Sequence, residues 1–187
     1  AANTKLALLD AAGTVHSYQW LRDGAQNEIE FLADIPLDGS ATYHLAAGAP
    51  RTDTDIKIEE SDTDIKLSNA HTGIDIRKTL TDGQGPIAAI KLASGKWIGD
   101  SMRAGTPALQ DYAVHVTQSG PVAGEIVCEA KFEGGKTWRL RFRLLSDEPA
   151  VIVSEVSKVG PGASWRLRLD NGFGPTKFQH RNPLAKT

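Results

Sequence analysis

The sequence is poor in the residues on which several protein classes depend. Its 187 residues include a single cysteine, Cys128, which excludes an internal disulfide and a thiolate-rich metal site. Cys128 lies in the apolar segment GEIVCEAKF, a setting typical of a small buried hydrophobe rather than of a nucleophile. The five histidines form no His-x-x-x-His or His-x-His pair, so we expect no metal site and no cofactor.

An excess of charge of one sign and long apolar runs are also lacking. The formal net charge is −2, and without a strongly basic field we expect no nucleic-acid partner. No apolar run approaches the roughly 20 residues that span a bilayer, so we expect no membrane-spanning segment. The segments GQGP and GPGAS match neither a phosphate-binding loop nor a Gly-x-Ser-x-Gly elbow, and both are typical of turns.

What the sequence does contain is the pattern of β-strands. In residues 136–145, KTWRLRFRLL, apolar side chains alternate with arginines, which is the period of a strand with one wet face. Residues 146–149, SDEP, are typical of a turn, and a β-branched run resumes in residues 151–156. We therefore predict two paired strands in a broad antiparallel sheet, one face of which carries arginines.

The same alternation extends along most of the chain and predicts an all-β fold in two parts. Residues 1–50 predict a small β meander or barrel-like unit, and the polar, proline-containing residues 49–55 mark its boundary. Residues 51–187 predict an antiparallel β-sandwich, similar to a supersandwich. Within it, the near repeats TDIKI and TDIKL are expected to form adjacent antiparallel strands, because two copies alone do not build a solenoid.

The end of the sequence shows a different pattern. Residues 173–187 have no strand period and no closing cap, although a broad sandwich needs every edge paired, covered or charged. Either this segment lies along the surface, or the chain is a piece of a longer protein whose remaining strands are missing. The openness of the last edge favours the second interpretation, so we expect the sandwich to be incomplete at its C-terminus.

Three stretches of the sequence resemble parts of one family of large enzymes. NEIEFLADIPLDGSATYHLAAG is similar to the end of an N-terminal β unit, and DIKLSNAHTGIDIRKT with GPIAAIKLASGKWI is similar to the strands that follow it. WRLRFRLLSDEPAVIVSEV resembles the long central strands of a galactose-mutarotase-like supersandwich. Together, over most of residues 1–160, they resemble the N-terminal β-rich portion of the exo-acting rhamnogalacturonan lyases.

The resemblance implies part of a polysaccharide lyase that acts on acidic polysaccharide by β-elimination, in the periplasm or outside the cell. Its implied partners are a polysaccharide or oligosaccharide and the remaining domains of a longer enzyme. In that family a helical-toroid catalytic region usually follows the β units, and no segment here resembles one, so we expect the isolated chain to be inactive. Two other functions stay open: a noncatalytic carbohydrate-binding or scaffold module, and part of a glycoside hydrolase, which needs two carboxylates across a cleft.

The segment NAHTGIDIRK groups several polar side chains around one turn and the strand after it. Asp75 and Arg77 share one face of that strand by its period of two, and His71 lies in the turn. In a catalytic interpretation Arg77 neutralises a uronate carboxylate and His71 moves a proton. Asn69 and Lys78 are then substrate-binding residues. In a structural interpretation, which is favoured, the segment is a solvated hairpin with an Asp75–Arg77 pair.

The arginine-bearing strand is a second candidate site. Arg139, Arg141 and Arg143 share one face of this strand, and Arg166 and Arg168 on a later strand are grouped with them. Guanidinium groups match carboxylates and vicinal hydroxyls, so a sheet that carries these arginines suits an acidic glycan. Alternatively, the arginines pair with neighbouring carboxylates or pack against another domain. Trp97, at the edge of a turn, is the tryptophan best placed to stack on a sugar ring, whereas Trp138 is in step with core positions.

Overall fold

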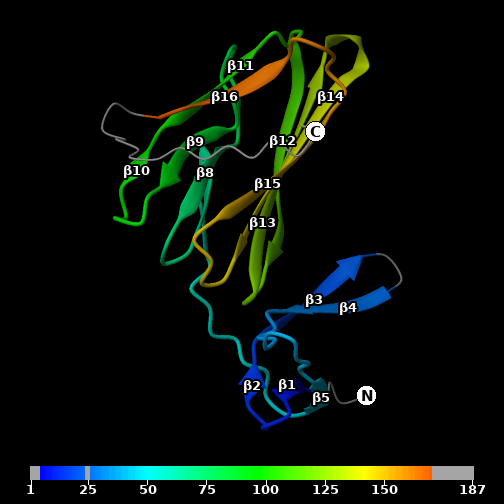
Figure 1. The fold of residues 1–187 in the computed structure, drawn as a ribbon. Coiled ribbons are helices and arrows are strands. Elements are labelled where there is room, and N and C mark those ends of the chain that lie inside the picture. Colours follow the sequence, from blue (N-terminus) through cyan, green and yellow to red (C-terminus); the bar gives the residue numbers. More distant parts are fainter. Residues whose placement is uncertain (1–4, 24–25, 170–187) are drawn as a thin grey trace.

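The computed structural model describes residues 5–23 and 26–169, which form a set of antiparallel β-sheets (Figure 1). The one helical element among these residues is a single 3-10 turn, η1 (Glu133–Gly135). The all-β fold class predicted from the alternation of apolar and polar side chains is therefore confirmed. The expectation about residues 173–187, and with it the incomplete C-terminal edge, lies outside the described residues.

Strands β1 to β5 form two small sheets in the first part of the chain. Their bounds are Leu6–Asp10 (β1), Val15–His16 (β2), Tyr18–Asp23 (β3), Gln26–Phe31 (β4) and Tyr43–Ala47 (β5). One sheet has the order β2-β1-β5, and β3 and β4 form a separate hairpin. The strands thus depart from a simple meander, because the long connection over residues 32–42 carries the chain back to pair β5 with β1. The hydroxyl of Tyr18 donates to the carbonyl of Leu6 at 2.9 Å and joins the two sheets.

The second part of the chain is a sandwich of a five-stranded and a four-stranded sheet. The five-stranded sheet, in the order β10-β9-β8-β7-β6, contains Lys57–Glu60 (β6), Asp64–Ser68 (β7), Gly73–Arg77 (β8), Ile87–Lys91 (β9) and Trp97–Ile98 (β10). The four-stranded sheet, in sequence order, contains Leu109–Ser119 (β12), Ala123–Phe132 (β13), Lys136–Leu145 (β14) and Val151–Ser157 (β15). A further pair joins β11 (Asp100–Ala104) to β16 (Ser164–Arg168).

Two predicted strand pairings are confirmed. The near repeats lie on β6 and β7, which pair antiparallel with Ile58 opposite Leu67. Residues 136–157 form the β14–β15 hairpin, in which Arg141 lies opposite Ser154. The SDEP turn between these strands includes Asp147 with a φ of 60°, a left-handed conformation that aspartate tolerates better than most residues.

The core lies between the two sheets and is built from alternate residues of their strands. Its buried members on the five-stranded sheet are Ile65, Leu67, Ile74, Ile76 and Ile87. Those on the four-stranded sheet are Ile126, Cys128, Ala130, Phe132, Trp138, Leu140, Phe142 and Leu144. Because successive strand residues point to opposite faces, the arginines of β14 lie on the outer face of the four-stranded sheet. Burial raises the pKa of the Cys128 thiol to about 12, which fits an inert core residue.

The sandwich has two ends, which separate the predicted site residues. The near end carries the turns of residues 69–72, 119–122 and 145–150, and it lies toward the first part of the chain (Figure 1). The far end carries residues 61–63 and 78–86, which are hydrogen bonded to each other and to β8. Residues 48–56, which connect the two parts, contribute an isolated bridge between Ser17 and Arg51 but no strand.

Candidate functional site

The two residues predicted to be catalytic lie at opposite ends of β8. His71 belongs to the near-end turn before the strand, and Arg77 is the last residue of the strand. From Gly73 to Arg77 the backbone rises by about 13 Å, since each strand residue adds about 3.3 Å. Proton transfer and charge neutralisation in one elimination must act on the same sugar residue. His71 and Arg77 lie too far apart for this, so the structure does not bring the predicted catalytic pair together.

Arg77 donates to groups of the protein itself. Its Nη1 donates to the carbonyl of Gly85 at 2.9 Å and to that of Ile87 at 2.6 Å. Its Nη2 donates to Oδ1 of Asp100 at 2.6 Å. The expected partner Asp75 is replaced by Asp100, because Asp75 lies beside Lys66 while β11 brings Asp100 to the end of β8.

The Asp100 carboxylate is held at the same time by a second arginine. Arg168 on β16 donates from Nη2 to Oδ2 of Asp100 at 2.9 Å. Burial acts to raise the pKa of Asp100, but the hydrogen bond and charge of Arg77, together with the N–H of Ser101 and the charge of Arg168, lower the pKa below its ordinary value. Arg77, Asp100 and Arg168 thus join β8, β11 and β16 as a structural cluster at the far end.

Asn69 and His71 join the two sheets at the near end. The buried Asn69 side chain donates to the carbonyls of Leu145 and Glu148. Its Oδ1 accepts from the backbone N–H groups of His71 and Thr72. Each polar group of the Asn69 side chain therefore has two protein partners.

The imidazole of His71 and the ammonium group of Lys78 also have protein partners. His71 Nε2 lies 2.8 Å from Oδ1 of Asp147 in the β14–β15 turn. Lys78 Nζ lies 2.5 Å from Glu60 Oε1 and donates to the carbonyl of Ser61 at 2.6 Å. These contacts are consistent with a structural role for both residues.

Asp55, which the sequence did not single out, also stabilises the near end. Its Oδ1 accepts from the hydroxyl of Ser146 at 2.8 Å and from the N–H of Asp147 at 3.1 Å. Its Oδ2 accepts from the N–H of Ala70 at 3.1 Å. Burial acts to raise the pKa of Asp55, but these hydrogen bonds outweigh it and lower the pKa. No local pattern marks Asp55, because its partners lie up to 92 residues away in the chain.

Asp75 has the least favourable environment of the predicted cluster. It is buried on the outer face of the five-stranded sheet, and its Oδ1 has no hydrogen-bond partner among the residues that the structure describes. Lys66 Nζ lies 4.0 Å from Oδ2, and the same ammonium group lies 5.5 Å from the centre of the Trp97 ring. Burial, followed by the negative charge of Asp64, raises the pKa of Asp75.

Replacing Asp75 by asparagine is expected to raise the free energy of unfolding at neutral pH but not in acid. The folded-state pKa of Asp75 lies above the ordinary value of 3.8. The free energy of unfolding of the wild-type protein therefore falls as the pH rises from below 3.8 through the folded-state pKa, because the ionised carboxyl is less favourable in the folded chain. Below that window both the folded and the unfolded chain hold the proton, and the penalty is absent. Denaturant unfolding of both proteins between about pH 3 and about pH 7 measures this difference. An equal gain at all pH values would contradict the account.

Trp97 and the arginines lie on opposite outer faces of the sandwich. Trp97 pairs with Lys91 on β9, on the face that also carries Lys66 and Asp75, and it is only partly exposed. One face of its indole ring is approached by the ammonium group of Lys66. The predicted substrate-binding residues therefore do not form a single site.

Arg139 and Arg141 form the most accessible group of predicted binding residues. Their side chains are 52% and 48% exposed. Arg139 Nε lies 3.4 Å from Glu129, and Arg141 Nε lies 3.7 Å from Glu125. Both distances exceed the usual N–H···O range of about 2.7–3.2 Å, so these are loose ion pairs. Glu125 was not singled out from the sequence, although its spacing from Glu129 places both carboxylates on the outer face of β13.

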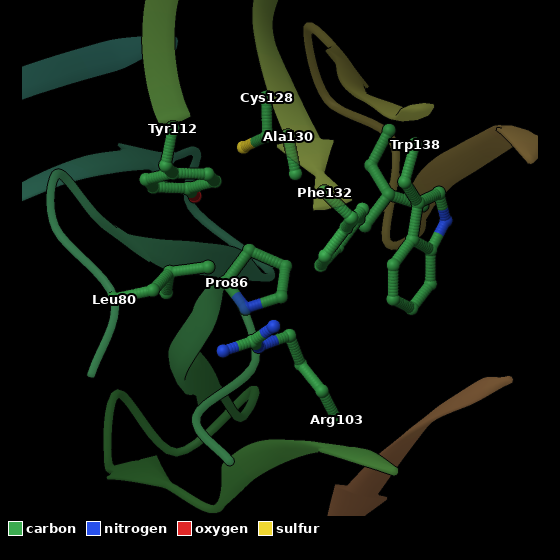
Figure 2. A pocket seen from close by; sticks show the side chains of 9 residues that line it. Leu80, Pro86, Arg103, Tyr112, Cys128, Ala130, Phe132 and Trp138 are labelled. Atoms are coloured by element: carbon green, nitrogen blue, oxygen red, sulfur yellow. The ribbon is translucent and has the colours of Figure 1, made fainter. Parts of the chain in front are cut away.

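A small cavity in the core does not qualify as a ligand site. The space open to a water-sized sphere is about 20 Å³, and Figure 2 shows the side chains around it, among them Tyr112, Cys128 and Trp138. Arg103 closes one side, with its guanidinium carbon 5.5 Å from the centre of the Phe132 ring. A space of this size holds about one water molecule and no sugar.

A larger groove of about 410 Å³ lies between the connecting segment and the β12–β13 turn. Its lining, which contains no charged side chain, consists of Thr52, Thr54, Ile56, Ile58, Ser119, Gly120 and Pro121. None of the site residues predicted from the sequence lines it. An acidic ligand therefore has no cationic partner in the lining of this groove.

Comparisons with known proteins leave the chain to be interpreted from its own residues: no family model matches it, and no curated protein and no solved structure does. In the described part of the chain, no helix is long and apolar enough to cross a membrane. The same residues contain no group of three or more His, Cys, Asp or Glu side chains placed to hold a metal ion.

Proposed function

We propose that the chain is the noncatalytic β-rich portion of a carbohydrate-active enzyme, of the polysaccharide lyase type, and that it binds acidic polysaccharide. The binding surface is the outer face of β13 and β14, called the arginine face and defined by Arg139 and Arg141. The observation that carries the proposal is that these two arginine side chains are about half exposed and only loosely paired. The resemblance of the sequence to rhamnogalacturonan lyases supports the acidic substrate class and an extracytoplasmic location.

The chemistry of the arginine face suits a chain of uronates. Arg139 and Arg141 are two residues apart on one strand, so their side chains leave the same face about 6.7 Å from each other. A planar guanidinium group offers five N–H donors, and a loose pair through Nε leaves the two Nη groups for a second anion. Each arginine is thus able to receive one carboxylate of an extended acidic ligand.

The arrangement of the other predicted residues supports a noncatalytic role. His71 and Arg77 lie at opposite ends of β8, and the donors of Arg77 are directed at Asp100 and at backbone carbonyls. A lyase needs its base and its carboxylate-neutralising group around one sugar residue. The catalytic part of the proposed enzyme is therefore assigned to its remaining domains.

Replacing both Arg139 and Arg141 by alanine is expected to weaken binding of an oligogalacturonate by roughly a hundredfold, since each guanidinium–carboxylate hydrogen bond contributes about tenfold in affinity. Arg166→Ala is the matched control, because Arg166 is exposed on β16 outside the arginine face. Calorimetric titration with the oligogalacturonate and with a neutral oligosaccharide of the same length measures the effect. Equal affinity of wild type and double variant for the acidic ligand would reject the proposed site.

The isolated chain is expected to show no lyase activity. Elimination at a uronate produces an unsaturated sugar that absorbs in the ultraviolet, so incubation with a panel of acidic polysaccharides tests this directly. No increase in absorbance above that of a boiled sample is expected for any substrate. A steady increase that is abolished in a His71→Ala variant would assign catalysis to this chain and contradict the noncatalytic role.

A further inference from the structure

Arg143, the third arginine of β14, differs from the other two in exposure and in its partner. Its side chain is 23% exposed, against 52% for Arg139 and 48% for Arg141. Its Nη2 forms an ion pair with Oε1 of Glu30, which lies on β4 in the first part of the chain. The row of arginines on β14 therefore continues to Arg143 at the near end, where the guanidinium group of Arg143 is already paired with the carboxylate of Glu30.

The Glu30 carboxylate is held in place by a buried side chain of β3. Gln19 donates from Nε2 to Oε2 of Glu30 at 3.1 Å and to Oε1 of Gln118 at 3.2 Å. Oε1 of Gln19 accepts from the N–H groups of Val122 at 3.2 Å and Ala123 at 2.9 Å. One amide side chain thus fixes both the β3–β4 hairpin and Glu30 against the β12–β13 turn.

The turn that receives Gln19 has no room for a larger residue. A Cβ atom on Gly120 would lie 2.1 Å from Oε1 of Gln19 and 2.7 Å from its Cδ, which is far inside van der Waals contact. Glycine at this position lets the amide of Gln19 approach the backbone of the turn. The contact between hairpin and turn is therefore close and polar, and it places a single carboxylate beside Arg143.

From this geometry we infer that Glu30 is an intramolecular competitor for acidic ligands at Arg143. The inference rests on the proposed function, in which uronate carboxylates bind the arginine face. The Glu30 carboxylate has the same charge and the same acceptor atoms as a uronate, so the two exclude each other at one guanidinium group. While Glu30 of the β3–β4 hairpin is paired with Arg143, only Arg139 and Arg141 are open to an acidic ligand. Displaced from Arg143, Glu30 opens a third subsite at the near end of the row.

The matched pair Glu30→Gln and Glu28→Gln tests the competition. Glutamine at position 30 removes the charge but retains an oxygen that accepts from Gln19, whereas Glu28 lies two residues away on β4 and is exposed. Titration with an oligogalacturonate is expected to give a roughly threefold to tenfold higher affinity for Glu30→Gln and no change for Glu28→Gln. Adding Arg143→Gln to the Glu30→Gln variant is expected to remove the gain.

A measurement on the wild-type chain covers the case in which a variant does not fold. Saturating oligogalacturonate is expected to speed amide hydrogen exchange in β3 and β4, because the ligand replaces Glu30 at Arg143. Unchanged affinity of the Glu30→Gln variant for the ligand, or unchanged hydrogen exchange in β3 and β4, overturns the inference. The proposed arginine face is still supported in that case if the Arg139→Ala and Arg141→Ala double variant loses binding. Absence of any binding by the wild-type chain rejects the proposed function and this inference with it.

Discussion

Replacing Arg77 by alanine is expected to lower the free energy of unfolding by about 3 kcal/mol or more and to leave oligogalacturonate affinity unchanged. The Arg77 side chain is 17% exposed and donates to Asp100 and to two backbone carbonyls. Its removal leaves the Asp100 carboxylate with one arginine and leaves the carbonyls of Gly85 and Ile87 without this donor. Breaking a largely buried pair costs more than the pair itself contributes, because the remaining charge stays desolvated.

Denaturant unfolding of the Arg77→Ala variant, with Lys78→Ala as the control, measures this effect. Lys78 is the next residue and pairs with Glu60, which is 59% exposed, so its removal is expected to cost no more than about 1 kcal/mol. A change in the free energy of unfolding indicates a structural role, and a change in affinity for the acidic ligand indicates a binding role. A stable Arg77→Ala variant with a reduced affinity for the acidic ligand would restore Arg77 as a binding residue and contradict its structural role.

Replacing Asn69 by alanine is expected to cost about 2–4 kcal/mol of unfolding free energy, since it removes four hydrogen bonds of about 1 kcal/mol each. The groups left behind include the carbonyls of Leu145 and Glu148 and the N–H groups of the 69–72 turn. Asn69 itself is buried, so water reaches few of these groups. The substitution removes the two Asn69 hydrogen bonds that join the five-stranded sheet to the β14–β15 turn at the near end.

Asn69→Asp is the informative control for Asn69→Ala. Aspartate retains the oxygen that accepts from His71 and Thr72 but places a second oxygen against the carbonyls of Leu145 and Glu148. It is therefore expected to be destabilising at neutral pH and less so in acid, where the protonated carboxyl is able to donate. Unfolding free energies within about 0.5 kcal/mol of wild type for both variants would contradict the assigned role.

The fold was largely predictable because its strands obey a simple period. The alternation in residues 136–145 predicted one buried and one wet face, and Trp138, Leu140 and Phe142 are buried on β14 while Arg139 is exposed. The SDEP turn predicted the β14–β15 hairpin in the same way. These features depend on neighbouring residues, so a short window of sequence contains the necessary information.

The surroundings of the predicted site residues were not predictable, because they come from distant segments. Arg77 meets Asp100, which is 23 residues away, rather than Asp75 on its own strand. Arg143 meets Glu30, which belongs to the first part of the chain. A strand period states that a side chain faces outward but not what covers it. Asn69 is an intermediate case, since asparagine two residues before a turn N–H is a local signal of an Asx turn.

Mapping the ligand on the wild-type chain tests most directly the central claim that the arginine face binds acidic glycan. Backbone amide NMR shifts are followed while an oligogalacturonate, and separately a neutral oligosaccharide of equal length, is added. Saturable shifts are expected on β13 and β14 around Arg139 and Arg141 with the acidic ligand alone. Shifts confined to the opposite face around Lys66 and Trp97, or equal shifts with the neutral ligand, would contradict the claim.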